Sequence, residues 1–566
     1  MKMFGKVSLG IALFAVAVVL FSGGSAQAAT FTVATGNDEN TDNASCALSE
    51  AIENINDGAT TNTDCSPTGA YGTDDTINLP TGTITLTADL TEIANSVIIQ
   101  GQSKADSIID GDSNTYTAFL IGQTAGVTNA AFRDFSITGA EEVGIAVCAA
   151  DVTMDNISVS DSGAGAVVAC TTPGHTVLSV EITDSEFNDN VSEGIGSYDV
   201  NSAGLFVQPY LSSDSCTGSL DVNIARVRAN NNSQGQLVSG LGVWGSAGSC
   251  SGAVSLEDVE SNRNTGSYAA GINLFFEGSV SSNLDRITAA DNSLVGTLAS
   301  LILFPVAGVS VYAGPISVSN ASIYGNMASP DGGSDVAFAG IMLLALNGSP
   351  DIDITNMTLT NNHLTNSSNL SNLGFSGAGT ASVATGDFTT FSSATITNLL
   401  AANNTIDEAP ATCQESVDFG SGPIELAVIS GGGNVIEDGT CAFGLDDPSD
   451  QNNVTGLFAT LAAPAYNDGF VQTVALLEGS PAIDAGVAVP FSLDAQQVSR
   501  SQGAAVDAGA YESAFTRAVN EASTDDTSTL AESGTTIIGL VILSTAILIG
   551  AVAVSRRRIG QFRLPV

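Results

Sequence analysis

The chain has 566 residues, of which 13% are charged and 60 are glycine, and its formal net charge is −45. This acidic balance argues against nucleic-acid binding, because recognition of phosphates needs a basic surface. Hydrophobic residues make up 43% of the chain, so enough apolar surface is available for a folded core and a wholly disordered chain is excluded.

The first 28 residues have the organisation of a secretory signal peptide. Lys2 and Lys6 precede an apolar run at 7–21, and small residues occupy Ala26-Gln27-Ala28. A basic start, an apolar centre and a small-residue end are typical of a cleaved export signal. We therefore expect residues 1–28 to be removed and the mature protein to be exported.

The part of the chain that would be displayed outside the cell is more acidic than the whole. Between residues 29 and 530 there are 8 basic and 58 acidic residues, a net charge of −50. Such a surface favours solubility and can collect divalent cations weakly. We expect no cofactor beyond this weak affinity for Ca²⁺.

Residues 29–126 are expected to form an N-terminal cap and the first coils of a repeat. The sequence CALSEAIENIN at 46–56 places Leu48, Ile52 and Ile55 on one face of a short helix. A solenoid needs a cover for its first apolar cross-section, and an amphipathic helix can supply it. Short strand-like segments surround this helix at 30–34, 75–79, 84–90, 96–103 and 107–112.

Residues 127–412 repeat a unit of strand, turn and strand. The segment 256–276, LEDVESNRNTGSYAAGINLFF, is one such unit, and similar units occupy 225–245, 321–344 and 357–377. An Asn closes the first strand near positions 231, 262, 292, 326 and 361. This spacing predicts a period of 30 to 36 residues, typical of a repeat architecture.

Parallel stacking of these units is the simplest arrangement that buries their apolar residues. Strands recur without intervening helices, which argues against alternating strands and helices in an open sheet. Asn and Gly at the turns fit positions that need left-handed backbone. We therefore predict an all-β solenoid of parallel coils, in which an Asn stacks under the Asn of the next coil.

Both ends of this region resemble a known family. CALSEAI at 46–52, followed by DDTINLPTGTITLT, is similar to the Cys-Ser-Leu-Arg-Glu-Ala-Ile opening of bacterial surface β-helix proteins, with Ala47 and Ser49 where Ser and Arg are usual. SPAIDAG at Ser480–Gly486 and DAGAYE at Asp507–Glu512 resemble the end of choice-of-anchor β-helix proteins. The resemblance implies a right-handed parallel β-helix of the pectate-lyase-like kind, with 413–513 as its C-terminal end.

The C-terminus carries the pattern of a surface anchor. Residues 514–529 are rich in Ser, Thr, Asp and Glu and are expected to form a flexible stalk. Residues 530–566 follow as the anchor, with an uncharged run at 537–554 and arginines at 556–558. An apolar run with a basic flank predicts a transmembrane helix whose tail lies in the cytoplasm.

The pentapeptide before this run resembles a sortase sorting signal. It consists of Leu530, Ala531, Glu532, Ser533 and Gly534, with Ser where the family usually has Thr. A plain membrane anchor and covalent attachment to the cell wall are therefore both open. Either arrangement displays the bulk of the chain on the cell surface.

The eight cysteines are expected to form disulfides between sequence neighbours. Their spacings of 19 to 34 residues are close to one coil length, so one turn returns the chain to nearly the same place. Close Cys-x-x-Cys pairs of a zinc site do not occur in the sequence. The predicted pairs are Cys46–Cys65, Cys148–Cys170, Cys216–Cys250 and Cys413–Cys441.

No residue pattern predicts a catalytic or metal centre. The only histidines, His175 and His363, have no Gly-His-Gly setting, and the chain contains no calcium-loop motif. Arg226 and Arg228 alternate on one strand, and with Asp221, Glu257 and Asp258 near in repeat register they could bind a sugar. The alternative is an ordinary solvated face with surface ion pairs.

The sequence leaves two classes of function open. Trp244, the only tryptophan, could stack on a sugar or could be buried in a strand. With Arg226 and Arg228 it makes up the candidate binding residues of a non-catalytic adhesion protein that interacts with a glycan or another surface. The alternative is a tethered polysaccharide lyase or glycoside hydrolase. The expected partners are an extracellular ligand and, through the C-terminal helix, the membrane.

Overall fold

The computed structural model describes residues 28–517 except 42, 115–116, 125, 171–176, 193–201, 210–218, 236, 246–250, 277–278, 296–304, 330–336, 346–350, 366–392, 414–415, 419–422, 426 and 501. The predicted signal peptide, most of the stalk and the predicted span at 537–554 lie outside these residues. Within them, no helix has both the length and the apolar character needed to cross a membrane.

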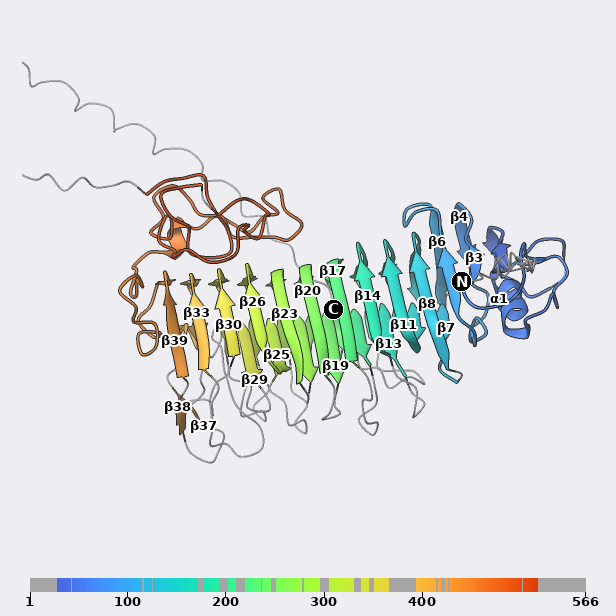
Figure 1. The fold of residues 1–566 in the computed structure, drawn as a ribbon, viewed down its shortest axis with the longest axis horizontal. Helices are drawn as coiled ribbons and strands as arrows, with labels where there is room; N and C mark the ends of the chain where they lie inside the picture. The colour runs from blue at the N-terminus through green and yellow to red at the C-terminus, as the bar shows by residue number, and fades with distance from the viewer. Residues whose placement is uncertain are drawn as a thin grey trace, which may run out of the picture. The chain divides into compact units, whose positions relative to one another are not determined.

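The described chain is all-β, and long parallel sheets run along a stack of coils (Figure 1). The largest sheet has 23 strands arranged in two rows that meet at a corner. The first row contains β1 (Thr30–Thr32), β3 (Asp75–Asn78), β5 (Val97–Gln100), β8 (Val127–Arg133), β11 (Ala149–Asp155), β14 (Ser179–Thr183), β17 (Ser219–Arg228), β20 (Ser251–Asn262), β23 (Ser279–Ala290), β26 (Ile316–Ser319), β30 (Asp351–Thr355), β33 (Ser393–Thr397) and β39 (Ala427–Gly432).

The second row has fewer strands of its own. Three long strands of the first row, β17, β20 and β23, continue through the corner and supply its missing members. Every pairing between the described strands of both rows is parallel, which confirms the stacked-coil prediction. The separate strands of the second row are β2 (Gly36–Asn37), β4 (Gly82–Thr85), β6 (Ser107–Asn114), β9 (Ser136–Ala140), β12 (Ser158–Ser160), β15 (Glu186–Asn188), β27 (Ser322–Tyr324), β31 (Thr358–Thr360), β34 (Leu400–Ala402) and β40 (Val435–Ile436).

Two further sheets complete the coils. Eight parallel strands form one of them: β7 (Phe119–Ile121), β10 (Ile145–Val147), β13 (Ala166–Ala169), β16 (Leu205–Gln208), β19 (Leu241–Gly245), β22 (Ile272–Phe276), β25 (Val309–Ala313) and β29 (Ile341–Ala345). Seven strands form the other: β18 (Ser233–Gly235), β21 (Thr265–Gly266), β24 (Ser293–Val295), β28 (Met327–Ser329), β32 (His363–Leu364), β35 (Thr405–Ile406) and β36 (Ala409–Pro410). A hairpin of β37 (Ser416–Asp418) and β38 (Pro423–Glu425) stands apart.

The core is built from residues that stack in register from coil to coil. In β17 the alternation of SLDVNIARVR turns Leu220, Val222 and Ile224 inward, and each of these side chains is at most 2% exposed. Ile224 aligns with Leu256 of β20, which aligns with Leu284 of β23. Each inward residue is thus covered by its neighbours above and below, so no single coil could bury it alone.

A row of left-handed residues forms the corner between the two rows of the large sheet. We call it the corner row, and its nine members have φ angles between 51° and 59°. Asn and Asp tolerate this conformation better than other residues with side chains, and they fill seven of the nine positions. The members are Asp134, Asn156, Asp184, Arg226, Asp258, Arg286, Asn320, Asn356 and Asn398.

A ladder of buried asparagines follows six residues after the corner row in seven successive coils. Each amide nitrogen donates to a main-chain carbonyl of a neighbouring coil, and in the first six rungs it also donates to the amide oxygen of the next rung at 2.9 to 3.1 Å. The side chains therefore satisfy backbone groups that the turn would otherwise leave unpaired. The rungs are Asn190, Asn232, Asn264, Asn292, Asn326, Asn362 and Asn404.

The ladder confirms the predicted stacking of asparagines but corrects its register and period. Asn292 and Asn326 are rungs, whereas Asn231 and Asn361 are left-handed residues one position earlier. Asn262 ends β20 and lies two residues before a rung. Rungs are 28 to 42 residues apart rather than 30 to 36, because the connections elsewhere in the coil differ in length.

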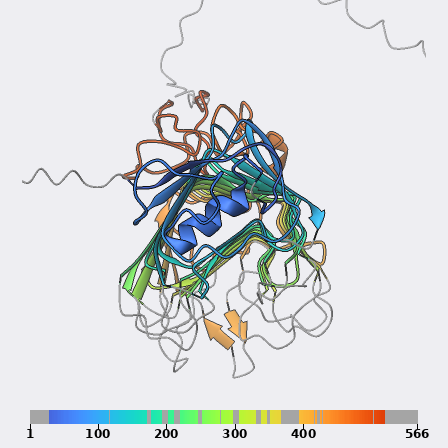
Figure 2. The same ribbon diagram turned by 90° about the vertical axis from the view of Figure 1, so that its right-hand side faces the viewer.

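The N-terminal end of the stack is covered by α1 (Leu48–Asp57), as predicted. Leu48, Ile52 and Ile55 share a face and are at most 1% exposed, and Figure 2 shows the helix lying across the coil. The Glu50 carboxylate accepts the main-chain N–H of Ala47 at 2.9 Å, which satisfies one of the free donors at the helix start.

Three of the four predicted disulfides are present. They join Cys46 to Cys65, Cys148 to Cys170 and Cys413 to Cys441. The fourth predicted pair, Cys216 and Cys250, lies outside the described residues.

Residues 437–517, which we call the C-terminal segment, contain almost no regular structure apart from the short 3₁₀ helix η1 (Phe458–Thr460). Buried carboxylates organise it by accepting main-chain N–H groups. Asp507 accepts from Asp484 and Ser513 at 2.7 Å, and Asp494 accepts from Glu512 at 2.8 Å. The motif residues at Asp507–Glu512 are therefore structural, since their side chains hold the loops of this segment together.

Candidate functional site

A column of polar residues runs across the coils on the outer face of the second row. We call it the outer column, and the strand register aligns all eight members one above the next. Seven of the eight side chains are hydroxyls or carboxylates, because this face of the strands points away from the core. The members are Ser136, Ser158, Glu186, Arg228, Glu260, Thr288, Ser322 and Thr358.

The C-terminal segment covers one half of the outer column, from Glu260 to Thr358. The main-chain N–H of Gln472 donates to Glu260 at 2.8 Å, and its carbonyl accepts from Thr288 at 2.6 Å. Farther along, the N–H of Ala510 donates to Thr358 at 2.9 Å. Glu260, Thr288 and Thr358 are consequently 0% exposed.

Arg228 lies at the boundary where this cover ends. Its Nε donates to Glu260 at 3.0 Å, and Nη2 donates to the Phe470 carbonyl at 3.1 Å. The guanidinium stands 4.3 Å from the Phe470 ring centre and 5.3 Å from that of Tyr466. This cation–π packing and the hydrogen bonds hold Tyr466 and Phe470, at the edge of the area that the C-terminal segment covers, against the solenoid.

Glu260 is the buried partner in this contact. Burial raises the pKa of its carboxyl, while the Gln472 N–H, the Arg228 guanidinium and the Tyr466 hydroxyl oppose that rise. The Tyr466 hydroxyl donates to it at 3.1 Å. A carboxylate removed from water is tolerated here because each of its oxygens receives hydrogen bonds.

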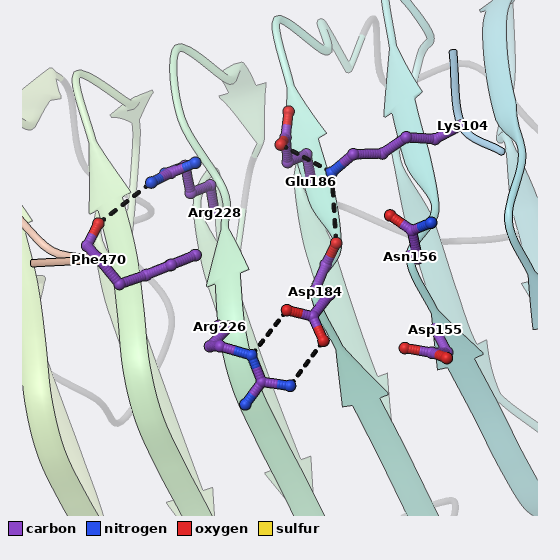
Figure 3. Close-up of a pocket in the computed structure, with 8 residues that line it drawn as sticks. All are labelled: Lys104, Asp155, Asn156, Asp184, Glu186, Arg226, Arg228 and Phe470. Carbon is purple, nitrogen blue, oxygen red and sulfur yellow. Dashed lines mark hydrogen bonds and ion pairs between the residues drawn. The ribbon is translucent and has the colours of Figure 1, made fainter. Parts of the chain in front are cut away.

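The other half of the outer column is open and borders a pocket with a volume of about 410 Å³. Side chains of both charges meet there, and Phe470 of the C-terminal segment forms one side (Figure 3). The lining residues are Lys104, Asp155, Asn156, Asp184, Glu186, Arg226, Arg228 and Phe470.

The cations of this pocket are held by ion pairs. Arg226 donates through Nε and Nη2 to the two oxygens of Asp184, each at 2.6 Å, and this hydrogen bonding lowers the pKa of the Asp184 carboxyl. Lys104 reaches across two coils to Glu186 at 2.9 Å and to the Asp184 carbonyl at 3.3 Å. These pairs are partly exposed, so they shape the pocket more than they stabilise the fold.

Arg226 and Arg228, which the sequence placed on one face, both line this pocket. Figure 3 shows that they diverge, with Arg226 directed toward Asp184 and Arg228 toward Phe470. The left-handed backbone at Arg226, with φ of 53°, breaks the simple alternation on which the prediction relied.

Two of the three carboxylates expected near these arginines lie on the adjacent coil. Glu257 and Asp258 form ion pairs with Arg286 of the next coil. Asp221 is exposed near the start of β17, on the far side of the corner from the pocket. Register nevertheless places Glu257 and Asp258 beside Arg226, whose pKa their charges help to raise. The expected proximity therefore holds for these two carboxylates, whereas Asp221 does not line the pocket.

Trp244 lies on a different sheet from the arginines. It belongs to β19, where its ring packs at 5.8 to 6.0 Å from those of Phe206, Tyr268 and Phe275. Its indole N–H donates to Asn273. Trp244 is therefore a half-buried member of an aromatic cluster and does not line the pocket.

The two histidines and the possible metal ligands form no further site among the described residues. His363 of β32 contacts Thr405 at 2.7 Å and Asn361 at 3.2 Å, and burial lowers the pKa of its imidazole. His175 lies outside the described residues. Among the residues that the structure describes, no group of three or more His, Cys, Asp or Glu could hold a metal ion.

Sequence reasoning missed most of the pocket. Asp184 and Asn156 belong to the corner row, and the recurrence of Asn or Asp six residues before a rung would have located Asp184. It would not have located Asn156, because the residue six positions after it is Ser162. Lys104, Asp155 and Glu186 carry no comparable signal. Phe470 is 242 residues from Arg228 in the chain, and only the folded arrangement of the C-terminal segment brings it to this place.

Comparisons with known proteins add no family to this description. A scan against protein-family models finds no match, and a search of curated proteins finds no significant relative. The likeness to surface β-helix proteins therefore rests on the residues of the two terminal motifs.

Proposed function

We propose that this protein is an exported, surface-anchored β-helix that binds an extracellular ligand without chemical turnover. In this proposal the coil is right-handed and related to choice-of-anchor surface proteins. Residues 1–28 direct export, and the apolar run at 537–554 anchors the chain, with or without cleavage at 530–534. The solenoid then displays the pocket and the outer column outside the cell.

The observation that supports a binding role is the pairing of charges in the pocket. General acid–base catalysis needs a group that can give or take a proton near the working pH. Arg226 is committed to Asp184, and Lys104 is committed to Glu186. Because the Asp184 carboxyl has a lowered pKa, it stays ionised and suits hydrogen bonding to a ligand rather than proton transfer.

Exposure to polysaccharides tests this proposal. The exported protein is incubated with polyuronates and neutral glycans, and unsaturated or reducing ends are measured alongside retention on the same polymers. We expect no new ends. Turnover that disappears in Arg226→Ala but persists in the exposed control Arg263→Ala would instead support a tethered lyase or hydrolase.

The anchor has a separate test. A chain lacking residues 530–566 is expected to appear in the medium, because it loses both the apolar run and the pentapeptide. Fractionation of cells and medium measures this directly. A truncated protein that stays bound to the cells would contradict anchoring through the C-terminus.

A further inference from the structure

We propose that the open half of the outer column, with the adjacent pocket, is a docking surface for an extended segment of a positively charged partner protein. This inference rests on the proposed binding function and names the class of its ligand. Its open members are Ser136, Ser158 and Glu186, and the neighbouring corner-row residues are Asp134, Asn156, Asp184 and Arg226.

The covered half of the column shows what kind of chain this face accepts. Its contacts with the C-terminal segment run largely through main-chain groups. Arg228 donates to the Phe470 carbonyl, Thr288 donates to the Gln472 carbonyl, and Glu260 accepts the Gln472 N–H. A carboxylate, a hydroxyl and a guanidinium therefore form hydrogen bonds with successive N–H and C=O groups of a polypeptide backbone.

The corner row also contacts the C-terminal segment along the covered half, through both side chains and the main chain. Gln497 donates to Asp258 at 3.3 Å, and Arg500 donates to Asn320 at 2.8 Å. Asn398 binds both main-chain groups of Val487, accepting its N–H at 2.7 Å and donating to its carbonyl at 2.9 Å. The C-terminal segment thus contacts two parallel lines of polar side chains, the outer column and the corner row.

Both the outer column and the corner row continue beyond Arg228, where the cover by the C-terminal segment stops. Register places Glu186 next to Arg228, then Ser158 and Ser136, so hydroxyl and carboxylate groups follow in the same positions. These three side chains are partly exposed, in contrast to the buried Glu260 and Thr288. The open half is continuous with an interface that already binds polypeptide.

Charge decides the kind of polypeptide. The pocket itself carries as many acidic as basic side chains, but it lies on a chain whose displayed part has 58 acidic and 8 basic residues. The field of such a protein attracts cationic partners and repels anionic ones. Phe470 adds an aromatic face at the boundary, where a side chain of the partner can pack.

The test is a selection with peptides. The exported protein is immobilised and challenged with a random library of twelve-residue peptides, and enriched peptides are resynthesised for binding measurements by fluorescence anisotropy. We expect enriched peptides to carry net positive charge. The same protein is probed with neutral and acidic glycans on an array as the competing ligand class.

Variants on the open half locate the binding. Glu186→Ala should weaken peptide binding about tenfold, the usual effect of losing a hydrogen bond to a charged group. Ser158→Trp should block the column sterically with a similar loss. Glu181→Ala, an exposed carboxylate on β14 outside the pocket, should change binding less than about twofold.

Thermal unfolding of all three variants separates loss of binding from loss of fold. The inference is overturned if no peptide binds, or if peptide binding is equal in Glu186→Ala and in the parent protein. It is also overturned if only glycans bind in a Glu186-dependent manner, an outcome that would leave the proposed binding function intact. Turnover of a glycan would instead defeat the proposed function itself.

Discussion

The two halves of the outer column share one register and one residue chemistry but differ in burial. Glu260 in the covered half is 0% exposed, whereas the Glu186 side chain, two coils away, is 32% exposed. Both accept from a basic residue, Glu260 from Arg228 and Glu186 from Lys104. The difference arises because the C-terminal segment covers Glu260 and supplies it with the Gln472 N–H and the Tyr466 hydroxyl, whereas Glu186 lies outside this cover.

This comparison shows that position on the solenoid does not by itself decide the role of a side chain. The same column contributes to stability where the chain covers it and remains available to a ligand where the cover ends. The boundary is set by Arg228, whose guanidinium contacts Phe470 on one side and lines the pocket on the other. Substitutions on either side of this boundary should therefore have very different effects.

The largest effect is expected from Glu260→Ala. Removing this carboxylate leaves the Arg228 Nε, the Gln472 N–H and the Tyr466 hydroxyl without their acceptor, at a cost of about 3 kcal/mol. Hydrogen exchange across residues 466–476 should accelerate accordingly. Glu186→Ala is the matched variant in the open half and should cost about 1 kcal/mol or less. Equal costs would remove the distinction between the two halves.

A second effect concerns the pH dependence of the C-terminal segment. Burial, aided by the nearby charge of Asp507, raises the pKa of Glu512 to about 7 although main-chain donors oppose it. A raised carboxyl pKa favours the folded form at low pH. The stability linked to Glu512 is therefore complete below its unfolded pKa near 4.5 and is lost as the pH rises through about 7.

The shift of Glu512 corresponds to about 3 kcal/mol between the two limits. Unfolding of the C-terminal segment, followed by hydrogen exchange between pH 4 and pH 8, should show this loss. Glu512→Gln should flatten the profile, whereas Glu478→Gln, an exposed residue of the same segment, should leave it unchanged. A profile that Glu512→Gln does not alter would assign the pH dependence to other groups.

Removing a rung of the asparagine ladder should cost a similar free energy of unfolding in both halves, because the ladder lies inside the coil in both. Asn264→Ala removes bonds to Ala229 and Asn292 and leaves the Asn232 N–H unpaired. We expect a cost of about 2 kcal/mol, measured by denaturant unfolding with Trp244 fluorescence. Asn190→Ala in the open half should cost a similar amount. A much smaller cost there would mean that the open end of the solenoid is already loosened.

The smallest effect is expected from Arg226→Ala. Its bidentate bond to Asp184 lies in a pair in which both side chains are more than 40% exposed, so its loss should cost less than about 1 kcal/mol. Arg286, with an 11% exposed side chain and three carboxylate partners, is the matched arginine on the covered side. Arg286→Ala should be clearly more destabilising in the same unfolding assay.

The sequence predicts the repeated parts of the fold better than the site. Apolar alternation in segments such as 219–228 and the recurrence of Asn give the strands, the parallel stacking and the cap helix, because each repeat carries the same local signal. Three of the five predicted positions miss the rung by one or two residues, since several asparagines crowd each turn and the sequence does not tell which of them stacks.

The pocket could not be derived in the same way. Phe470 and Arg228 are brought together by the course of an irregular segment whose loops are set by buried carboxylates such as Asp494 and Asp507. Such contacts join residues far apart in the sequence, and no repeated sequence pattern marks them. The pairing of Arg286 with Glu257 and Asp258 was also missed, because these carboxylates lie between two coils that both carry an arginine and the sequence does not tell which one they bind.

The constant interval between corner row and ladder gives the molecule a modular character. Six residues separate each rung from its corner residue in all seven coils, from Asp184 and Asn190 to Asn398 and Asn404, while the remainder of the coil varies in length. Insertions and deletions are thereby confined to connections away from this face. The outer surface can diversify its loops in evolution or engineering while the aligned columns keep their spacing.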